Sequence, residues 1–259
     1  MNNPVELQLS QPGTDLMKKY PGRIEVLKHP SGMTFYTLRW RSEPYGKLVI
    51  GRPPHTVTLP FALSAKAYED SYFPDEKIVN WNINAGLTEG DEIAHEAARE
   101  KFFGILKSLR NAGWQRVILR SDPRLDGKDN MQYVLEDSSV SYLDPDYLPE
   151  IKEWMMLGNR STWGLYLDHA YLTVTLTRDP TRTDINKPGA YFIEYALRTD
   201  TQEMRSYVDP DQRKSWKAVL PGVLAKAKEE REKLEEEWQR KGARIDRQYQ
   251  DPPVPELTP

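Results

Sequence analysis

The chain has 259 residues, with 36 lysines and arginines against 39 aspartates and glutamates, which gives a formal net charge of -3 at pH 7. This balance disfavours a nucleic-acid-binding domain, because such domains usually carry an excess of basic residues. The absence of cysteine excludes a disulfide framework, a thiolate nucleophile and a cysteine-ligated metal site. No run approaches the roughly 20 apolar residues that cross a bilayer.

The N-terminal half predicts an arm followed by strands. Residues 1–30 are polar and rich in proline, which predicts a loosely attached arm with a short strand near residues 23–27. An N-terminal subdomain is expected over residues 31–135. Its β-branched and aromatic runs, several of which alternate apolar and polar residues, are typical of strands. These predicted strands cover residues 34–40, 47–50, 55–62 and 78–83.

The clearest single element is an amphipathic helix that begins near Thr88 and ends at Gly113. Thr88 followed by Asp91 fits a capping box, and glycine adopts the left-handed conformation that ends a helix. A strand from Trp114 to Leu119 follows, so we expect the helix to pack on a sheet. Apolar residues at three- and four-residue spacing form its predicted buried stripe: Ile93, Ala97, Ala98, Phe102, Ile105, Leu106 and Leu109.

A second subdomain is expected over residues 136–208. After a loop at residues 121–129, residues 131–136 fit either a strand or a helix. A helix is predicted over Tyr147–Leu157, with Leu148, Ile151, Trp154 and Met155 facing inward. Strands at residues 163–168 and 171–178 flank a tight turn at 168–170, and residues 191–197 form another strand. The order predicts an α+β fold with antiparallel sheets and packed helices, and it raises the hypothesis of two similar subdomains.

The C-terminal part predicts a long charged helix over residues 209–245 and a disordered tail over residues 246–259. Residues 226–241 are almost entirely charged, which is typical of a solvated helix supported by pairs of opposite charge three and four residues apart. Leu234 and Trp238 leave one narrow apolar edge. We expect this edge to dock on the body of the protein, and a partner's groove is the alternative.

No metal site or cofactor is predicted. His95 and Glu96 begin like the helical zinc-protease signature, but Arg99 stands where the second histidine ligand is required. Asp122, Asp126 and Asp129 only partly match a calcium loop, so hydrogen-bonded turns are the favoured interpretation there. The sequence also lacks a serine elbow, a phosphate loop and a dinucleotide fingerprint. We therefore expect a protein that is not an enzyme.

The remaining feature is a set of charged and aromatic side chains in the predicted loops. Tyrosine, tryptophan and arginine dominate protein interfaces, because they offer a large rigid area with a polar tip or a bidentate fork. Burial of the aromatic residues in the core is the competing interpretation. The predicted partner-binding residues are Arg124, Asp126, Tyr142, Asp144, Asp146, Tyr147, Arg178, Arg182 and Asp184.

Three segments together carry a resemblance to a known class of protein. They are residues 112–127 (AGWQRVILRSDPRLDG), 143–168 (LDPDYLPEIKEWMMLGNRSTWGLYLD) and 172–195 (LTVTLTRDPTRTDINKPGAYFIEY). This middle part of the chain resembles periplasmic immunity lipoproteins that are encoded beside type VI secretion lipase effectors, particularly effectors of the phospholipase D kind.

The resemblance implies a periplasmic protein, anchored through a lipidated N-terminal cysteine, that binds and neutralises a cognate lipase or phospholipase toxin. The present chain has neither that cysteine nor a signal peptide at its start. Occlusion of the toxin's active site is the mechanism we expect, because it needs no chemistry from the inhibitor. The alternative is an envelope-associated module that binds a ligand or another protein.

Overall fold

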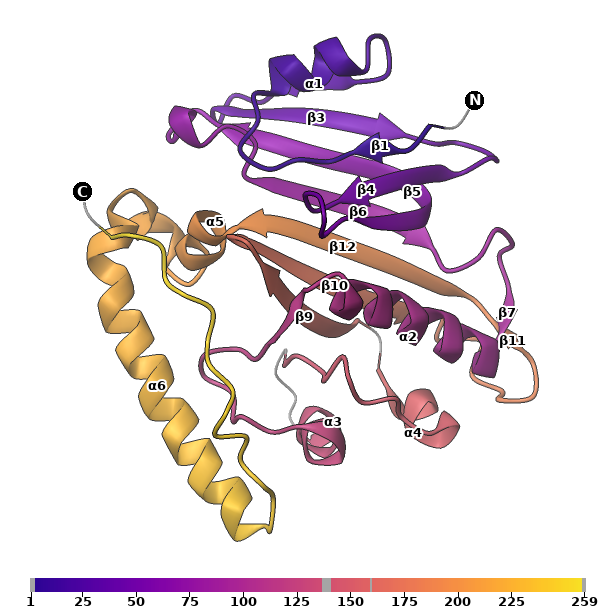
Figure 1. The fold of residues 1–259 in the computed structure, drawn as a ribbon, viewed down its shortest axis with the longest axis vertical. Helices are drawn as coiled ribbons and strands as arrows, with labels where there is room; N and C mark the ends of the chain where they lie inside the picture. The colour runs from indigo at the N-terminus through magenta and orange to yellow at the C-terminus, as the bar shows by residue number, and fades with distance from the viewer. Residues whose placement is uncertain (1–2, 137–140, 159, 258–259) are drawn as a thin grey trace.

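A ten-stranded, mostly antiparallel sheet runs through the computed structural model, which describes residues 3–136, 141–158 and 160–257 (Figure 1). The sheet order is β1-β4-β5-β6-β12-β10-β9-β8, and β3 also pairs with β5 and carries β2 on its outer side. Its strands are β1 (Val5–Glu6), β2 (Glu25–Lys28), β3 (Met33–Arg39), β4 (Gly46–Ile50), β5 (Val57–Asp70), β6 (Asn80–Gly86), β8 (Gln115–Val117), β9 (Ser161–Leu167), β10 (Ala170–Arg178) and β12 (Tyr191–Thr199).

Helices and one small two-stranded sheet complete the described fold, which confirms the predicted α+β class and the long C-terminal helix. The two-stranded sheet pairs β7 (Ile93–Ala94) with β11 (Pro188–Gly189). The helices are α1 (Gly13–Lys19), α2 (His95–Asn111), α3 (Gly127–Glu136), α4 (Ile151–Met156), α5 (Asp200–Arg205) and α6 (Trp216–Arg240), with 3₁₀ turns η1 (Pro74–Glu76) and η2 (Pro210–Ser215).

Strand β5 organises the N-terminal half. Its residues 57–62 pair with β4 and its residues 64–70 pair with β3 along the same edge, while β6 occupies the other edge. The sequence predicted only residues 55–62 of this strand. The missed part contains alanines and charged residues, which have low intrinsic strand propensity. Ala65 and Ala67 are nevertheless fully buried, so tertiary packing decides the conformation here.

The sheet is continuous between the two predicted subdomains. Strand β6 from the first half pairs with β12 from the second along their whole length, from Asn80 opposite Arg198 to Gly86 opposite Phe192. Apolar residues of both halves also belong to a single core cluster. The two predicted subdomains therefore share one sheet and one core cluster, and the boundary predicted at residues 135 and 136 falls at the end of α3.

Helix α2 covers the apolar face of the sheet (Figure 1). Its stripe residues Ala98, Phe102, Leu106 and Leu109 are buried as predicted, and Gly113 follows with φ of +100°. The predicted start at Thr88 is wrong. The helix begins at His95 without a side-chain cap, because the preceding residues are extended in the β7–β11 pair.

The N-terminal arm is packed on the body, which corrects the prediction of a loose attachment. Strand β1 pairs with β4, and Val5, Leu7 and Leu16 are buried in the core. Helix α1 supplies Leu16. The segment carries few apolar residues, but three of them lie where the sheet edge and the core bury them.

The C-terminal tail is also placed on the body, which corrects the prediction of disorder. The Tyr249 hydroxyl accepts a hydrogen bond from the backbone N–H of Ile118 at 2.8 Å, and Arg120 donates to the carbonyl of Pro252 at 2.6 Å. Val254 and Leu257 pack against an apolar cluster built around Trp216 and Leu220. Specific contacts thus order a sequence whose proline content indicated a flexible chain.

Candidate functional site

The nine predicted partner-binding residues do not form one patch, and two of them lie beside opposite ends of α2. Asp146 accepts two hydrogen bonds of 2.9 Å from Arg110 at the helix's C-terminal end. Arg182 pairs with Glu92, which precedes its N-terminal end. The 17 residues of α2 separate these contacts by about 25 Å. A compact partner can therefore contact the predicted residues at one end of α2, whereas a partner that contacts both ends must span the helix.

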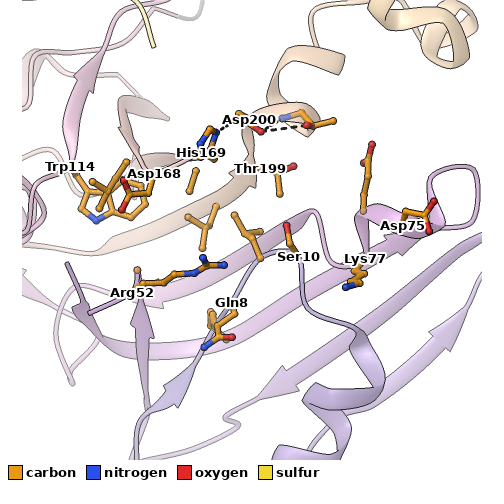
Figure 2. A pocket seen from close by; sticks show the side chains of 18 residues that line it. Gln8, Ser10, Arg52, Asp75, Lys77, Trp114, Asp168, His169, Thr199 and Asp200 are labelled. Atoms are coloured by element: carbon orange, nitrogen blue, oxygen red, sulfur yellow. Dashed lines mark hydrogen bonds and ion pairs between the residues drawn. The ribbon is translucent and has the colours of Figure 1, made fainter. Parts of the chain in front are cut away.

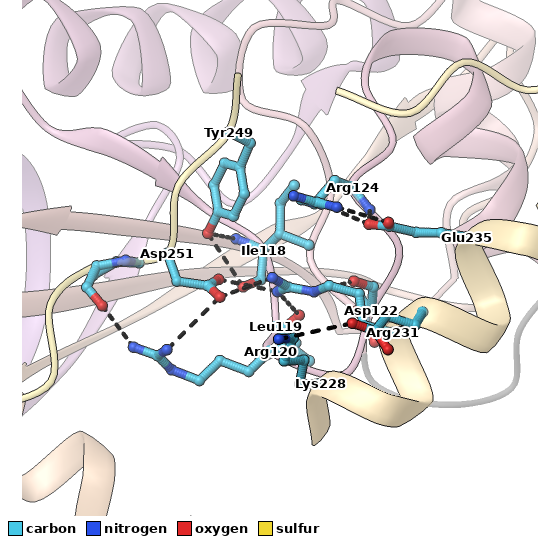
Figure 3. Close-up of polar contacts among 12 residues, drawn as sticks. Ile118, Leu119, Arg120, Asp122, Arg124, Lys228, Arg231, Glu235, Tyr249 and Asp251 are labelled. Carbon is cyan, nitrogen blue, oxygen red and sulfur yellow. Dashed lines mark hydrogen bonds and ion pairs between the residues drawn. The ribbon is translucent and has the colours of Figure 1, made fainter. Parts of the chain in front are cut away.

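Arg124 and Asp126 contact the C-terminal segment, and Figure 3 shows the contact of Arg124. Arg124 donates to both carboxylate oxygens of Glu235 in α6, at 2.7 and 2.8 Å. Asp126 lies 3.3 Å from a guanidinium nitrogen of Arg244. The hydrogen bond to Glu235 outweighs burial and raises the pKa of Arg124. For Glu235, burial raises the pKa, but hydrogen bonds from Arg124 outweigh it and lower the pKa overall.

Arg231 completes this attachment from the middle of α6 (Figure 3). Its buried guanidinium donates to the carbonyls of Asp122 and Leu119, at 2.9 and 2.8 Å, and to the carboxylate of Asp251 at 2.8 and 3.0 Å. Trp238 packs edge-on against Tyr133, with ring centroids 5.6 Å apart. The apolar edge of the C-terminal helix therefore docks on the body.

Asp144 and Tyr142 face inward. Asp144 is buried and accepts hydrogen bonds from the backbone N–H groups of Gly127 and Asp146, at 2.8 and 2.9 Å. Tyr142 lies against Gly164 of β9, where an added Cβ would come within 2.2 Å of the tyrosine ring. Burial raises the pKa of the Tyr142 phenol. These two residues shape the loop before α4.

Asp146, Tyr147 and Arg178 surround the short helix α4. The Tyr147 hydroxyl lies 2.9 Å from the carboxylate of Glu153, and burial together with this hydrogen bond raises the pKa of Tyr147 to about 12. Glu153 also accepts from the backbone N–H of Glu150 in a capping box. Arg99 of α2 donates to the carbonyl of Pro149 at 2.8 Å and Arg178 donates to the carbonyl of Met155 at 3.0 Å, so the α4 segment is tied to the body at both ends.

A buried aromatic cluster anchors α4 to α2. Trp154 is buried beside Phe102 and Phe103 of α2, with ring centroids 5.9 and 6.2 Å away. Its indole N–H donates to the Tyr191 hydroxyl at 3.1 Å. Tyr191 also contacts His95, which is buried. Burial lowers the pKa of His95.

Two apolar side chains of this anchored segment are exposed to solvent. Met156 is 62% exposed and Leu148 is 50% exposed, and both lie among charged neighbours, Asp146 and Lys152, that face solvent. We call these four residues the α4 surface. The prediction that Leu148 faces inward is wrong. Helix α4 begins only at Ile151, so helical spacing does not apply to residue 148.

Arg182 and Asp184 lie in the loop between β10 and β11. Asp184 is exposed and accepts a hydrogen bond of 3.1 Å from the backbone N–H of Asn186, and this bond lowers the pKa of its carboxyl group. Arg182 pairs with Glu92 and Asp179. The loop therefore presents a local charge network that is separate from the α4 surface.

A cavity of about 330 Å³ is the main feature that sequence reasoning missed (Figure 2). It lies between the β1 segment and the turn that joins β9 to β10. That turn confirms the predicted tight hairpin, since Leu167 pairs with Ala170 and both Asp168 and His169 have positive φ, at +44° and +63°. His169 Nδ1 lies 2.7 Å from Asp200 Oδ2, which joins the turn to α5.

The His169–Asp200 pair resembles two members of a hydrolytic triad. Such a triad also needs a hydroxyl nucleophile hydrogen-bonded to the second imidazole nitrogen. Within the described ranges, neither Ser10 nor Thr199, which also line the cavity, is hydrogen-bonded to His169. The same ranges contain no cluster of three or more histidine, aspartate or glutamate side chains that could hold a metal ion.

Comparison with protein-family models, curated proteins and solved structures finds no match for this chain. Among the helices that the structure describes, none is long and apolar enough to cross a membrane.

Proposed function

We propose that this chain is a non-enzymatic immunity protein that binds a cognate secreted phospholipase in the periplasm and occludes its active site. The supporting observation is the α4 surface, where Met156 and Leu148 are exposed on a segment that hydrogen bonds and aromatic packing hold in place. The resemblance of residues 112–195 to immunity lipoproteins supplies the class of partner. The α4 surface lies within those residues.

Exposed apolar side chains on an ordered segment favour tight association. Binding loses less conformational entropy when the contact surface is already ordered, and methionine is enriched at protein interfaces because its unbranched side chain adapts to a partner. The capping box and the bond from Arg178 supply this order at α4. Met156 is accordingly the residue we expect to be buried most completely by the toxin.

Charges beside the apolar pair would orient the partner. Asp146 is half exposed and forms an ion pair with Arg110, whose side chain is also partly exposed. Such surface pairs contribute only about 0–1 kcal/mol, so Asp146 can exchange its partner at little cost. Lys152 stands exposed on the same segment. A toxin with complementary charges around an apolar rim would be steered to this surface.

Occlusion of the active-site mouth accounts for neutralisation without any reaction by the inhibitor. A lipase must admit a lipid chain and often moves a lid to do so, and a bound protein can block either step. A rigid segment with two projecting apolar side chains, such as the α4 surface, is suited to fill an opening that normally receives acyl chains. The inhibitor then needs only a surface that fits the active-site mouth and binds it tightly.

A capture experiment from the native host tests this proposal. Immobilised wild-type chain should retain one predominant protein with phospholipase activity, and a Leu148→Asp, Met156→Asp double variant should retain little of it. Met17→Asp is the matched control, because Met17 is 42% exposed on α1 at the other end of the molecule (Figure 1). Equal retention of the phospholipase by the double variant, or retention of none by wild type, would refute the proposal.

A further inference from the structure

His95 lies where three elements of the fold meet. It is the first residue of α2, and its side chain is buried beside the β7–β11 pair at that end of the helix (Figure 1). An added Cβ on Gly189 of β11 would come within 2.4 Å of its imidazole. Tyr191 of β12 packs edge-on against the same ring, with ring centroids 5.8 Å apart. A change of charge at this imidazole therefore acts directly on β11 and β12.

Two hydrogen bonds connect this imidazole to α4 through Tyr191. The indole N–H of Trp154 donates to the Tyr191 hydroxyl at 3.1 Å, and the same hydroxyl contacts Nδ1 of His95. An indole nitrogen can only donate, so the hydroxyl oxygen accepts from Trp154 and its hydrogen remains for Nδ1. Nδ1 accepts that hydrogen only when it carries no proton of its own. The connection therefore requires the neutral imidazole.

The surroundings of His95 disfavour a positive charge on it. Burial, the largest cause, and Arg178 of β10 lower its pKa, while Asp184 of the loop between β10 and β11 opposes them through its backbone and its charge. The N-terminal end of a helix carries a partial positive charge, and His95 lies in the first turn of α2. Other carboxylates on or beside the adjoining elements are engaged: Glu150 and Glu153 in the α4 capping box, Glu96 with Arg99, Glu92 and Asp179 with Arg182, and Glu194 with Arg160.

Protonation of Nδ1 would break the connection between His95 and α4. Nδ1 would then direct a hydrogen at the Tyr191 oxygen, which already accepts from Trp154, and the hydroxyl hydrogen would lose its acceptor. An unpaired buried polar group is costly, so the contacts around the imidazole must rearrange. Trp154 is the buried anchor of α4, and a helix of six residues is not stable without its tertiary contacts. Helix α4 is therefore the element that loosens.

We propose that the chain of contacts from Trp154 through Tyr191 to His95 is a pH-sensitive latch for α4. The neutral imidazole holds α4 against α2 and β12, and protonation in mild acid loosens α4 while the central sheet stays folded. The latch is a property of the isolated chain and is independent of any toxin. Only its effect on binding by the α4 surface would rest on the proposed function.

The direction of the pH effect follows from the lowered pKa of His95. The unfolded imidazole takes up a proton near the ordinary value of 6.5, whereas the folded imidazole does so at a lower pH. The stability that the latch contributes is therefore complete above pH 6.5 and is lost as the pH falls through the lowered pKa.

Hydrogen-exchange mass spectrometry of the isolated chain tests the latch, together with an NMR titration of the His95 imidazole over the same pH range. After correction for the intrinsic pH dependence of exchange, protection of α4 should fall by about tenfold or more between about pH 7.5 and about pH 5. Protection of β6 in the central sheet should change by less than about twofold. Unchanged protection of α4, an equal loss of protection in β6, or a His95 midpoint at or above 6.5 would overturn the proposal.

Two variants assign the pH response to this latch. His95→Asn keeps an uncharged acceptor near the position of Nδ1, so α4 should stay protected in mild acid. Tyr191→Phe keeps the ring and removes the bridging hydroxyl, so α4 should be less protected already at neutral pH and its pH response should disappear. His29→Asn is the matched control, because His29 is exposed beyond the end of β2 and its loss should leave the wild-type response. A wild-type response of α4 in either latch variant would contradict the proposal.

Discussion

Replacement of Phe102 by alanine should destabilise the protein strongly, because this residue joins α2 to the sheet and to α4. Phe102 is 0% exposed, and its ring centroid lies 4.6 Å from that of Trp163 in β9, 5.8 Å from Phe103 and 5.9 Å from Trp154. Burial of such a side chain contributes about 1.5–3 kcal/mol, and each aromatic pair adds about 0.5–1.5 kcal/mol. Buried Phe→Ala changes cost about 3–5 kcal/mol in general. We expect the upper half of that range.

Urea denaturation followed by circular dichroism measures this cost. With a slope of about 2.5 kcal/mol per M, a loss of about 4–5 kcal/mol lowers the midpoint by about 1.5–2 M. Lys107→Ala is the control, since Lys107 is exposed on the same helix and its loss should change the unfolding free energy by less than about 0.5 kcal/mol. A midpoint for Phe102→Ala equal to that of the control would refute the packing of α2 described above.

Three further predictions concern single contacts. Glu235→Gln should lower the unfolding free energy by about 1–3 kcal/mol, because it weakens the bond to Arg124. The folded pKa of Glu235 lies below its ordinary 4.5, so the difference in unfolding free energy between wild type and variant should be constant above pH 4.5 and shrink as the pH falls through the lowered pKa. Urea titrations at several pH values measure this difference. Gly164→Ala should cost about 1–3 kcal/mol, since the new Cβ meets the Tyr142 ring, and an unchanged melting temperature would contradict this contact. Gly104→Ala should instead stabilise α2 by about 0.5–1 kcal/mol, because nothing lies within 4 Å of the added Cβ; a lower melting temperature would contradict it.

The sequence correctly predicted the elements whose conformation depends on residues only a few positions away. The stripe of α2, the glycine after it and the two-residue turn between β9 and β10 each depend on neighbours a few residues away. The pairing of β6 with β12 joins residues more than 100 positions apart, and the second half of β5 is extended only because its alanines pack in a core formed by distant strands. A short stretch of sequence does not reveal such long-range strand pairing and core packing.

The predicted site residues show the same limit. Charged and aromatic loop residues were expected on the surface, but Asp144 is buried and accepts from backbone N–H groups, and Arg124 is engaged by Glu235, a partner 111 positions away. Charge reversal at Arg124 should therefore loosen α6 as well as affect any partner, whereas Asp146 remains a surface position. The cavity escaped prediction because six separate chain segments line it, and none of them carries a motif.

The most direct test of the proposed function is a titration of the cognate phospholipase with this chain while lipid hydrolysis is followed. We predict that activity falls linearly to background at one chain per enzyme, and that the Leu148→Asp, Met156→Asp variant inhibits at least 100-fold more weakly while its melting temperature stays within a few degrees of wild type, since both side chains are exposed. Full hydrolysis at a tenfold molar excess of wild-type chain, or equal inhibition by the double variant, would contradict the account.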